Sequence, residues 1–168
     1  ATLGIMTDRK MVMVSGVEEL NAFAADLVAE LASRREKRGE KEKGATIVGL
    51  SGELGAGKTT LVQGVAHALG VEGPVASPTF VIEKIYALAG QPWRRLVHID
   101  AYRLENIREL THLGWVELAG DTDNLILIEW PERIPGSDPA VTTTISFEVV
   151  GEHARKLTVA TSDESHES

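Results

Sequence analysis

The segment 51-SGELGAGKTT-60 combines three glycines with a lysine and two threonines, which are residue types that bind phosphate groups. It satisfies the pattern G-x-x-x-x-G-K-[ST] with Gly52, Gly57, Lys58 and Thr59. Glycines allow positive φ and a close backbone approach to phosphate oxygens, and the N–H groups and following helix attract the anion. The motif predicts a phosphate-binding loop (P-loop) in which Lys58 reaches the β- and γ-phosphates and the Thr59 hydroxyl binds Mg²⁺.

Two acidic residues follow apolar runs and are candidates for the metal and for catalysis. Glu129 follows 125-LILI-128, and Asp100 follows 96-LVHI-99. Because the carboxyl ends of parallel strands meet at the ligand-binding edge of an α/β sheet, we expect both carboxylates beside the P-loop. We assign Glu129 to Mg²⁺, directly or through water, and Asp100 to the attacking water. The alternatives are an indirect role of Asp100 at the metal and, for either acid alone, a surface ion pair.

Two more residues admit a functional and a structural interpretation. Thr79 begins the segment 79-TFVIEKIYAL-88, where its hydroxyl could sense the γ-phosphate as a switch segment does. A plain turn that leads into a strand explains Thr79 equally well. His98 has no second histidine or cysteine to complete a metal site, so we expect it to be a structural residue beneath Tyr102.

Apolar periodicity predicts the elements that position these residues. The β-branched run 45–51 indicates a buried parallel strand that enters the P-loop, and the apolar spacing of 61–69 indicates a helix that leaves it and stops at Gly70. The other expected elements are a helix over 16–34 opened by a Ser15–Glu18 capping box, strands over 79–88, 94–100 and 125–130, a short helix over 105–113, and a hairpin of strands 142–150 and 154–160.

Composition limits the class of protein. A chain of 168 residues suits one domain, which we place at 6–160, followed by a polar tail at 161–168 that we expect to be disordered. The formal charge of −8 argues against a free-standing nucleic-acid binder, and the absence of cysteine excludes disulfides and thiol chemistry. With no signal peptide and no apolar run of membrane-spanning length, we expect a cytoplasmic protein without a membrane partner.

The chain resembles the TsaE family of small bacterial P-loop ATPases, which are required for threonylcarbamoyl-adenosine formation on tRNA. The resemblance covers about residues 12–160 and rests on four segments in the family's order: 52-GELGAGKTT-60, 77-SPTF-80, 98-HIDAYRL-104 and 129-EWPE-132. It implies an α/β fold of the P-loop NTPase type, a three-layer sandwich whose mainly parallel central sheet carries added antiparallel strands. It also implies bound ATP or ADP with Mg²⁺, and slow ATP hydrolysis.

The resemblance further implies partners. Family members act with TsaD, which transfers the threonylcarbamoyl group, and with TsaB, which pairs with TsaD. Their ATP cycle resets that complex between turnovers, so tRNA would be contacted only indirectly. The charged segment 34–43 is longer than usual before the P-loop strand and could alter docking.

Site roles carried over from the family agree with the motif analysis. Asp100 takes the acid role of the HxDxYR segment, Thr79 the switch role, and Trp130 packs beside the site. Arg155 resembles an arginine that lies near the nucleotide base. The metal role falls on Thr59 and Glu129, and nucleotide binding on Leu54, Gly55, Ala56, Gly57, Lys58, Thr59 and Thr60.

Other functions of the same loop need different features. A small-molecule kinase should carry an arginine-bearing lid and an acceptor pocket, and this chain has few residues to spare for a lid. The chain could also be a nucleotide-gated binding module, in which hydrolysis only sets when a partner is released. This alternative includes the same ATP hydrolysis and differs from the ATPase mainly in what the hydrolysis is for. A regulatory GTPase is disfavoured because no N-K-x-D segment is present to read guanine.

Overall fold

A seven-stranded sheet forms the centre of the molecule in a computed structural model that describes residues 5–38, 44–53, 55–72, 75, 83–105, 107–133 and 142–164. The strands are β1 (Ile5–Ser15), β2 (Thr46–Gly52), β3 (Glu83–Ala87), β4 (Arg95–Asp100), β5 (Asn124–Glu129), β6 (Thr143–Val149) and β7 (Ala154–Glu164). The helices are α1 (Gly16–Arg38), α2 (Lys58–Ala68), α3 (Ile107–His112) and α4 (Trp115–Gly120), with short 3₁₀ turns η2 (Ala101–Arg103) and η3 (Pro131–Arg133).

The sheet is parallel in its centre and antiparallel at its edges. The strand order is β1-β7-β6-β2-β5-β4-β3; β2 is parallel to β5 and β6, and β4 is parallel to β5. At the edges, β3 runs antiparallel to β4, and β7 runs antiparallel to both β6 and β1. This arrangement confirms the expected mainly parallel sheet with added antiparallel strands.

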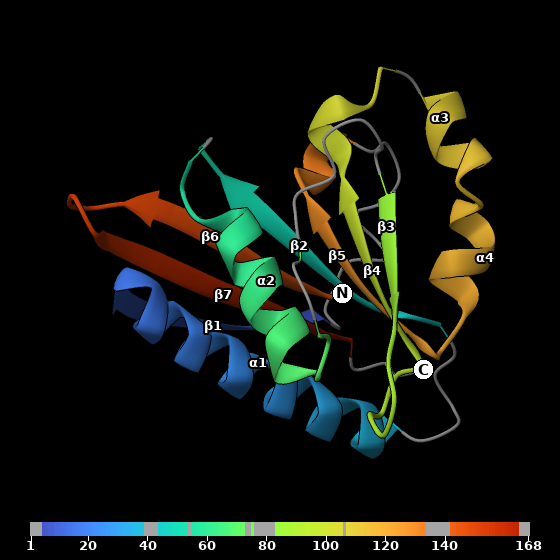
Figure 1. The fold of residues 1–168 in the computed structure, drawn as a ribbon, viewed down its shortest axis with the longest axis horizontal. Helices are drawn as coiled ribbons and strands as arrows, with labels where there is room; N and C mark the ends of the chain where they lie inside the picture. The colour runs from blue at the N-terminus through green and yellow to red at the C-terminus, as the bar shows by residue number, and fades with distance from the viewer. Residues whose placement is uncertain are drawn as a thin grey trace.

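Helices cover both faces of this sheet (Figure 1). Alternate residues of β5 enter two different cores: Leu125 and Leu127 pack with α1 and α2, whereas Ile126 and Ile128 pack with α4. The near-continuous apolar run of this strand is typical of a parallel strand that is buried on both sides. The three-layer architecture predicted from the sequence is therefore confirmed.

The first and last strands differ from the sequence prediction. No element was expected before residue 16, yet β1 pairs with β7 from Ile5↔Glu164 to Ser15↔Ala154. Residues 161–164, expected to be a disordered tail, therefore belong to a strand, because pairing with β1 satisfies their backbone groups. Helix α1 also runs to Arg38, four residues beyond the expected end, and α4 was not foreseen. No helix among the described residues is long and apolar enough to cross a membrane.

Helix α1 packs closely against α2, the helix that follows the P-loop. At Gly64 of α2, an added Cβ would lie 2.8 Å from Asn21 Oδ1 and 3.0 Å from Ala24 Cβ, both on α1. An added side chain would therefore displace the Asn21 side chain and press against Ala24 of α1. Glycine at this position therefore sets how near α1 approaches the P-loop helix.

Gly64→Val is expected to lower the free energy of unfolding by about 1–3 kcal/mol, because overpacking forces two buried helices apart. Gly120→Val is the matched control, since a Cβ at Gly120 in α4 would meet no atom within 4 Å. Urea denaturation of both variants measures the difference. Equal stability of the two variants would contradict the close packing of α1 on α2.

Candidate functional site

The P-loop connects the C-terminal end of β2 to the N-terminus of α2. Gly52 has φ 141° and Gly57, which precedes the first helical residue, has φ 109°. An added Cβ at Gly52 would lie only 2.7 Å from the carbonyl oxygen of Phe147 on the neighbouring β6. Both the positive φ and the close approach exclude other residues at this position, so the first glycine of the motif is required by the fold itself.

Lys58, the first residue of α2, is a buried residue at the end of this loop. Its Nζ donates hydrogen bonds to the carbonyl oxygens of Gly52, at 2.6 Å, and Glu53, at 2.8 Å, and lies 4.3 Å from the centre of the Trp130 ring. Burial lowers the pKa of Lys58, and the nearby carboxylates of Glu129, Glu132 and Asp100 act in the opposite direction. The Lys58 ammonium is thus held by the carbonyl oxygens of the loop and lies among acidic side chains near the carboxyl ends of β4 and β5.

The two residues assigned to the metal are in contact. Thr59 Oγ1 lies 3.1 Å and 3.3 Å from the two carboxylate oxygens of Glu129, which is 5% exposed at the end of β5. A hydroxyl and a carboxylate oxygen are ligands that suit Mg²⁺. The donor set that the sequence predicts is therefore assembled at one point beside Lys58.

Asp100 ends β4 directly beside Glu129. The two residues are register partners in the parallel β4–β5 pair, so their side chains point to the same face of the sheet. Asp100 is buried, and its Oδ1 accepts a hydrogen bond of 3.1 Å from the backbone N–H of Tyr102, the second residue of η2. This bond fixes the aspartate at the edge of the sheet where the P-loop opens.

His98 contacts the site, which the sequence analysis did not foresee. Its Nε2 lies 2.6 Å from Glu129 Oε2, and the ring is fully buried. On β4, His98 and Asp100 alternate with Val97 and Ile99, which belong to the α4 side of the core. The period of two along a strand therefore places His98 on the face of Glu129, and the parallel register could have indicated the contact.

Two aromatic rings and two cations make a series of contacts beside the P-loop. The Trp130 ring contacts both the Lys58 ammonium and the Tyr102 ring, whose centre is 5.1 Å away, and the Arg133 guanidinium lies 5.0 Å from the Tyr102 ring centre. Trp130 has φ 63°, an uncommon conformation for a bulky residue that costs roughly 1–3 kcal/mol. Its N–H donates to Leu50 O of β2, which helps to hold this turn.

Arg155 lies against the loop from the β7 side. Its Nε donates a hydrogen bond of 3.2 Å to the carbonyl oxygen of Ala56, and Nη1 donates to the carbonyl oxygens of Gly151 and Ala154. The guanidinium thus links the β6–β7 turn to the middle of the P-loop. This contact is with the loop backbone, so Arg155 helps to hold the P-loop, and its predicted place near a nucleotide base stays a prediction.

Comparisons with known proteins identify the family of the chain. The family described as "Threonylcarbamoyl adenosine biosynthesis protein TsaE" matches residues 14–157. The chain belongs to this family. A TsaE protein of Treponema pallidum is 37% identical over 119 residues, which are 71% of this chain and 84% of that protein. A TsaE protein of Streptomyces coelicolor is 49% identical over 88 residues, 51% of this chain and 57% of that relative, so this match spans less than two thirds of the relative's length.

The fold is similar to that of a solved structure. A crystal structure of Bacillus subtilis YdiB superimposes with a TM-score of 0.60 at 25% identity, covering 93% of this chain and 87% of the other. The similarity therefore extends over most of the fold rather than over the P-loop region alone. The TsaE-family membership predicted from four short motifs is confirmed by the family match and by the TsaE relatives.

The remaining predicted site residues of this TsaE-family chain lie in the loop, in α2 or outside the described residues. Gly55 has φ 78° on the exposed side of the loop, and Thr60 lies half-buried in the first turn of α2. Leu54 and Thr79 lie outside the described residues, as do 39–43 of the charged segment, whereas 34–38 form the end of α1. The roles assigned to Leu54 and Thr79 therefore stay predictions.

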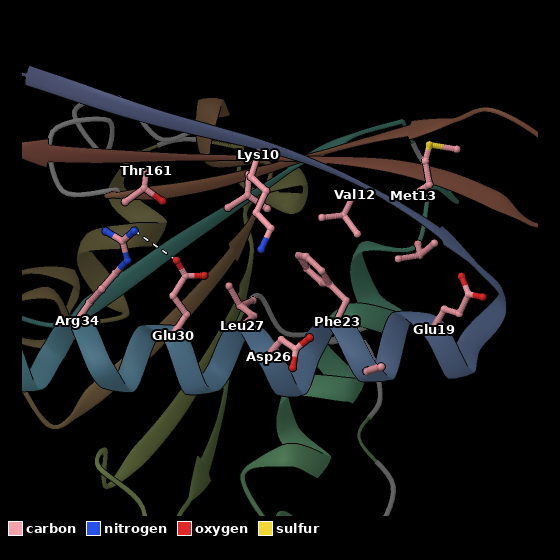
Figure 2. A pocket seen from close by; sticks show the side chains of 13 residues that line it. Lys10, Val12, Met13, Glu19, Phe23, Asp26, Leu27, Glu30, Arg34 and Thr161 are labelled. Carbon is pink, nitrogen blue, oxygen red and sulfur yellow. Dashed lines mark hydrogen bonds and ion pairs between the residues drawn. The ribbon is translucent and has the colours of Figure 1, made fainter.

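A separate cavity of about 520 Å³ lies between α1 and the β1–β7 pair (Figure 2). Apolar side chains such as Val12, Phe23 and Leu27 line its middle, and charged side chains such as Lys10 and Glu19 lie around them. None of the residues predicted for the nucleotide site lines this cavity. The cavity is therefore distinct from the predicted nucleotide site at the P-loop.

Proposed function

We propose that this chain is the ATP-binding and ATP-hydrolysing subunit required for threonylcarbamoyl-adenosine modification of tRNA, acting with TsaD and TsaB by ATP-dependent resetting of their complex. One observation carries the nucleotide part of the proposal: the Thr59 hydroxyl meets the Glu129 carboxylate beside the buried Lys58. A lysine, a hydroxyl and a carboxylate are the groups with which P-loop NTPases bind a magnesium–nucleotide complex. Membership of the TsaE family supports the proposed role in threonylcarbamoyl-adenosine formation.

The P-loop backbone and Lys58 would bind the phosphates of ATP or ADP, with Arg155 supporting the loop at Ala56. Thr59 and Glu129 would hold Mg²⁺, which would supply positive charge to neutralise the phosphates. The described residues contain no cluster of three or more His, Cys, Asp or Glu side chains that could hold a metal. This agrees with magnesium sites that take one or two protein ligands and complete their shell with phosphate and water.

Asp100 would position the attacking water, and Thr79 would sense the γ-phosphate. The carboxylate of Asp100 ends β4 in register with Glu129, so a water held by Asp100 would lie beside the metal-bound phosphate rather than on the far side of the sheet. The Tyr102 N–H bond keeps the Asp100 side chain at that edge. We further propose that the predicted domain of residues 6–160, together with the end of β7 up to Glu164, acts as a single domain.

The arginines near the P-loop bear on how hydrolysis is activated. Arg133 lies over the Tyr102 ring, and Arg155 donates hydrogen bonds to carbonyl oxygens of the loop and of the β6–β7 turn. Both guanidinium groups thus have protein partners, and we assign neither as a finger on the γ-phosphate. P-loop enzymes that receive such an arginine from a partner gain roughly 10³–10⁵-fold in rate, which favours a partner-supplied charge here.

ATP hydrolysis by the isolated chain is expected to be slow and to rise when the cognate TsaD–TsaB pair is added. If docking is electrostatic, the stimulation should fall with added salt, because exposed charges are screened beyond about 8–10 Å. The measurement is phosphate release with and without the pair across a salt series, accompanied by a pull-down of the pair. Fast hydrolysis that the pair leaves unchanged would contradict the proposal.

A further inference from the structure

The His98 side chain is buried in a place where packing alone would favour an apolar residue. Its ring is 0% exposed, and Leu96 and Leu127 on the same face of the sheet are fully buried in the core around α2. Burying an imidazole costs free energy unless its nitrogens are hydrogen-bonded. Nδ1 has no hydrogen-bond partner in the part of the chain that the structure describes, so the contact of Nε2 with Glu129 is the one that justifies a histidine.

The contact also has a definite direction. The contact of Nε2 with Glu129 Oε2 is 2.6 Å long. A carboxylate that binds Mg²⁺ can only accept hydrogen bonds, so in the proposed site Nε2 is the nitrogen that donates to Oε2. Thr59 Oγ1 lies 3.1 Å from the same oxygen and 3.3 Å from Oε1. His98 therefore holds Glu129 from the core side, while Thr59 meets it from the side of the P-loop.

A glutamate at a strand end has three rotatable side-chain bonds, and an unanchored carboxylate would sample several orientations. Groups that hydrogen-bond a ligating side chain fix its orientation, and their removal typically weakens metal binding about 10–100-fold. We propose that His98 is a positioning residue, which holds the Glu129 carboxylate in the orientation that binds Mg²⁺ together with Thr59. This inference rests on the proposed nucleotide and Mg²⁺ site.

The test compares two replacements of His98 that differ in hydrogen bonding. His98→Leu keeps an apolar side chain of suitable size but has no donor. His98→Gln can bring an amide N–H towards Glu129 Oε2. Ile99→Val is the matched control on the opposite face of β4, because it loosens the same buried strand without touching Glu129.

ADP affinity is measured by calorimetry for all four proteins, once with Mg²⁺ and once with a chelator, and thermal melting is recorded alongside. In the wild type and in Ile99→Val, Mg²⁺ should strengthen ADP binding to the same extent. His98→Leu should lose about tenfold or more of this strengthening while its metal-free ADP affinity stays unchanged. His98→Gln should recover most of the loss, a recovery that a merely structural role of the ring would not produce.

A folded His98→Leu protein with the wild-type response to Mg²⁺ would overturn the inference and leave the proposed function standing. A wild type that binds ADP without any response to Mg²⁺ would overturn the metal site and the inference with it. If His98→Leu does not fold, His98→Asn replaces it with the same expectation, because the shorter amide does not extend to Glu129 Oε2.

Discussion

Lys58→Ala is expected to bind ATP and ADP at least tenfold more weakly than the wild type. Hydrogen bonds to charged groups contribute about 1.5–3 kcal/mol, and 1.4 kcal/mol corresponds to a factor of ten in affinity. Lys58 is a buried residue whose ammonium is fixed by the Gly52 and Glu53 carbonyl oxygens, so it needs little reorganisation to meet a phosphate. The contact should therefore contribute at least the lower end of that range.

The same hydrogen bonds make a control necessary, because removal of the ammonium also deprives the two loop carbonyl oxygens of a donor. Calorimetric titration with ADP should therefore be paired with thermal melting of each variant. Lys84→Ala is the matched control, since Lys84 is an exposed lysine on β3 and should bind nucleotide normally. Near-normal nucleotide binding by a normally melting Lys58→Ala protein would remove the P-loop assignment.

Much of the site could be predicted because its signals are local. The G-x-x-x-x-G-K-[ST] pattern occupies consecutive residues, and the positive φ of Gly52 and Gly57 is a property of the turn itself. The meeting of Glu129 with Thr59 required one further step, the rule that parallel strands present their carboxyl ends at one edge. Buried apolar runs before both acids made that rule applicable.

The unforeseen features depend on partners that are distant in sequence. Strand β1 exists because it pairs with β7, at the opposite end of the chain, and residues 5–15 alone give no clear periodic signal. The Trp130 turn combines a left-handed backbone with ring contacts to Lys58 and Tyr102, and none of these follows from the propensity of tryptophan. The sequence prediction for His98 asks only whether the residue can bind a metal directly. It does not consider a hydrogen bond to a metal-binding residue such as Glu129.

The acids at the edge of the sheet should give separable phenotypes. Glu129→Gln keeps the shape of the side chain and an oxygen that accepts from Thr59 and His98, but it removes the negative charge that binds Mg²⁺. Nucleotide binding by this variant should depend much less on Mg²⁺ than binding by the wild type. Calorimetry with and without the metal measures the change, and Glu152→Gln, an exposed acid between β6 and β7, serves as the control.

Asp100→Asn should bind Mg-ATP nearly as well as the wild type yet hydrolyse it about 100-fold more slowly or worse. The amide oxygen can still accept from the Tyr102 N–H, so η2 should keep its start, but a neutral amide cannot take a proton from the attacking water. Positioned acid–base groups typically contribute about 10²–10⁴-fold, which sets the expected loss. The measurement is single-turnover phosphate release at saturating Mg-ATP, alongside calorimetry on the same preparation. If Asp100→Asn instead lost the metal dependence of binding while Glu129→Gln kept it and hydrolysed slowly, the two roles would have to be exchanged.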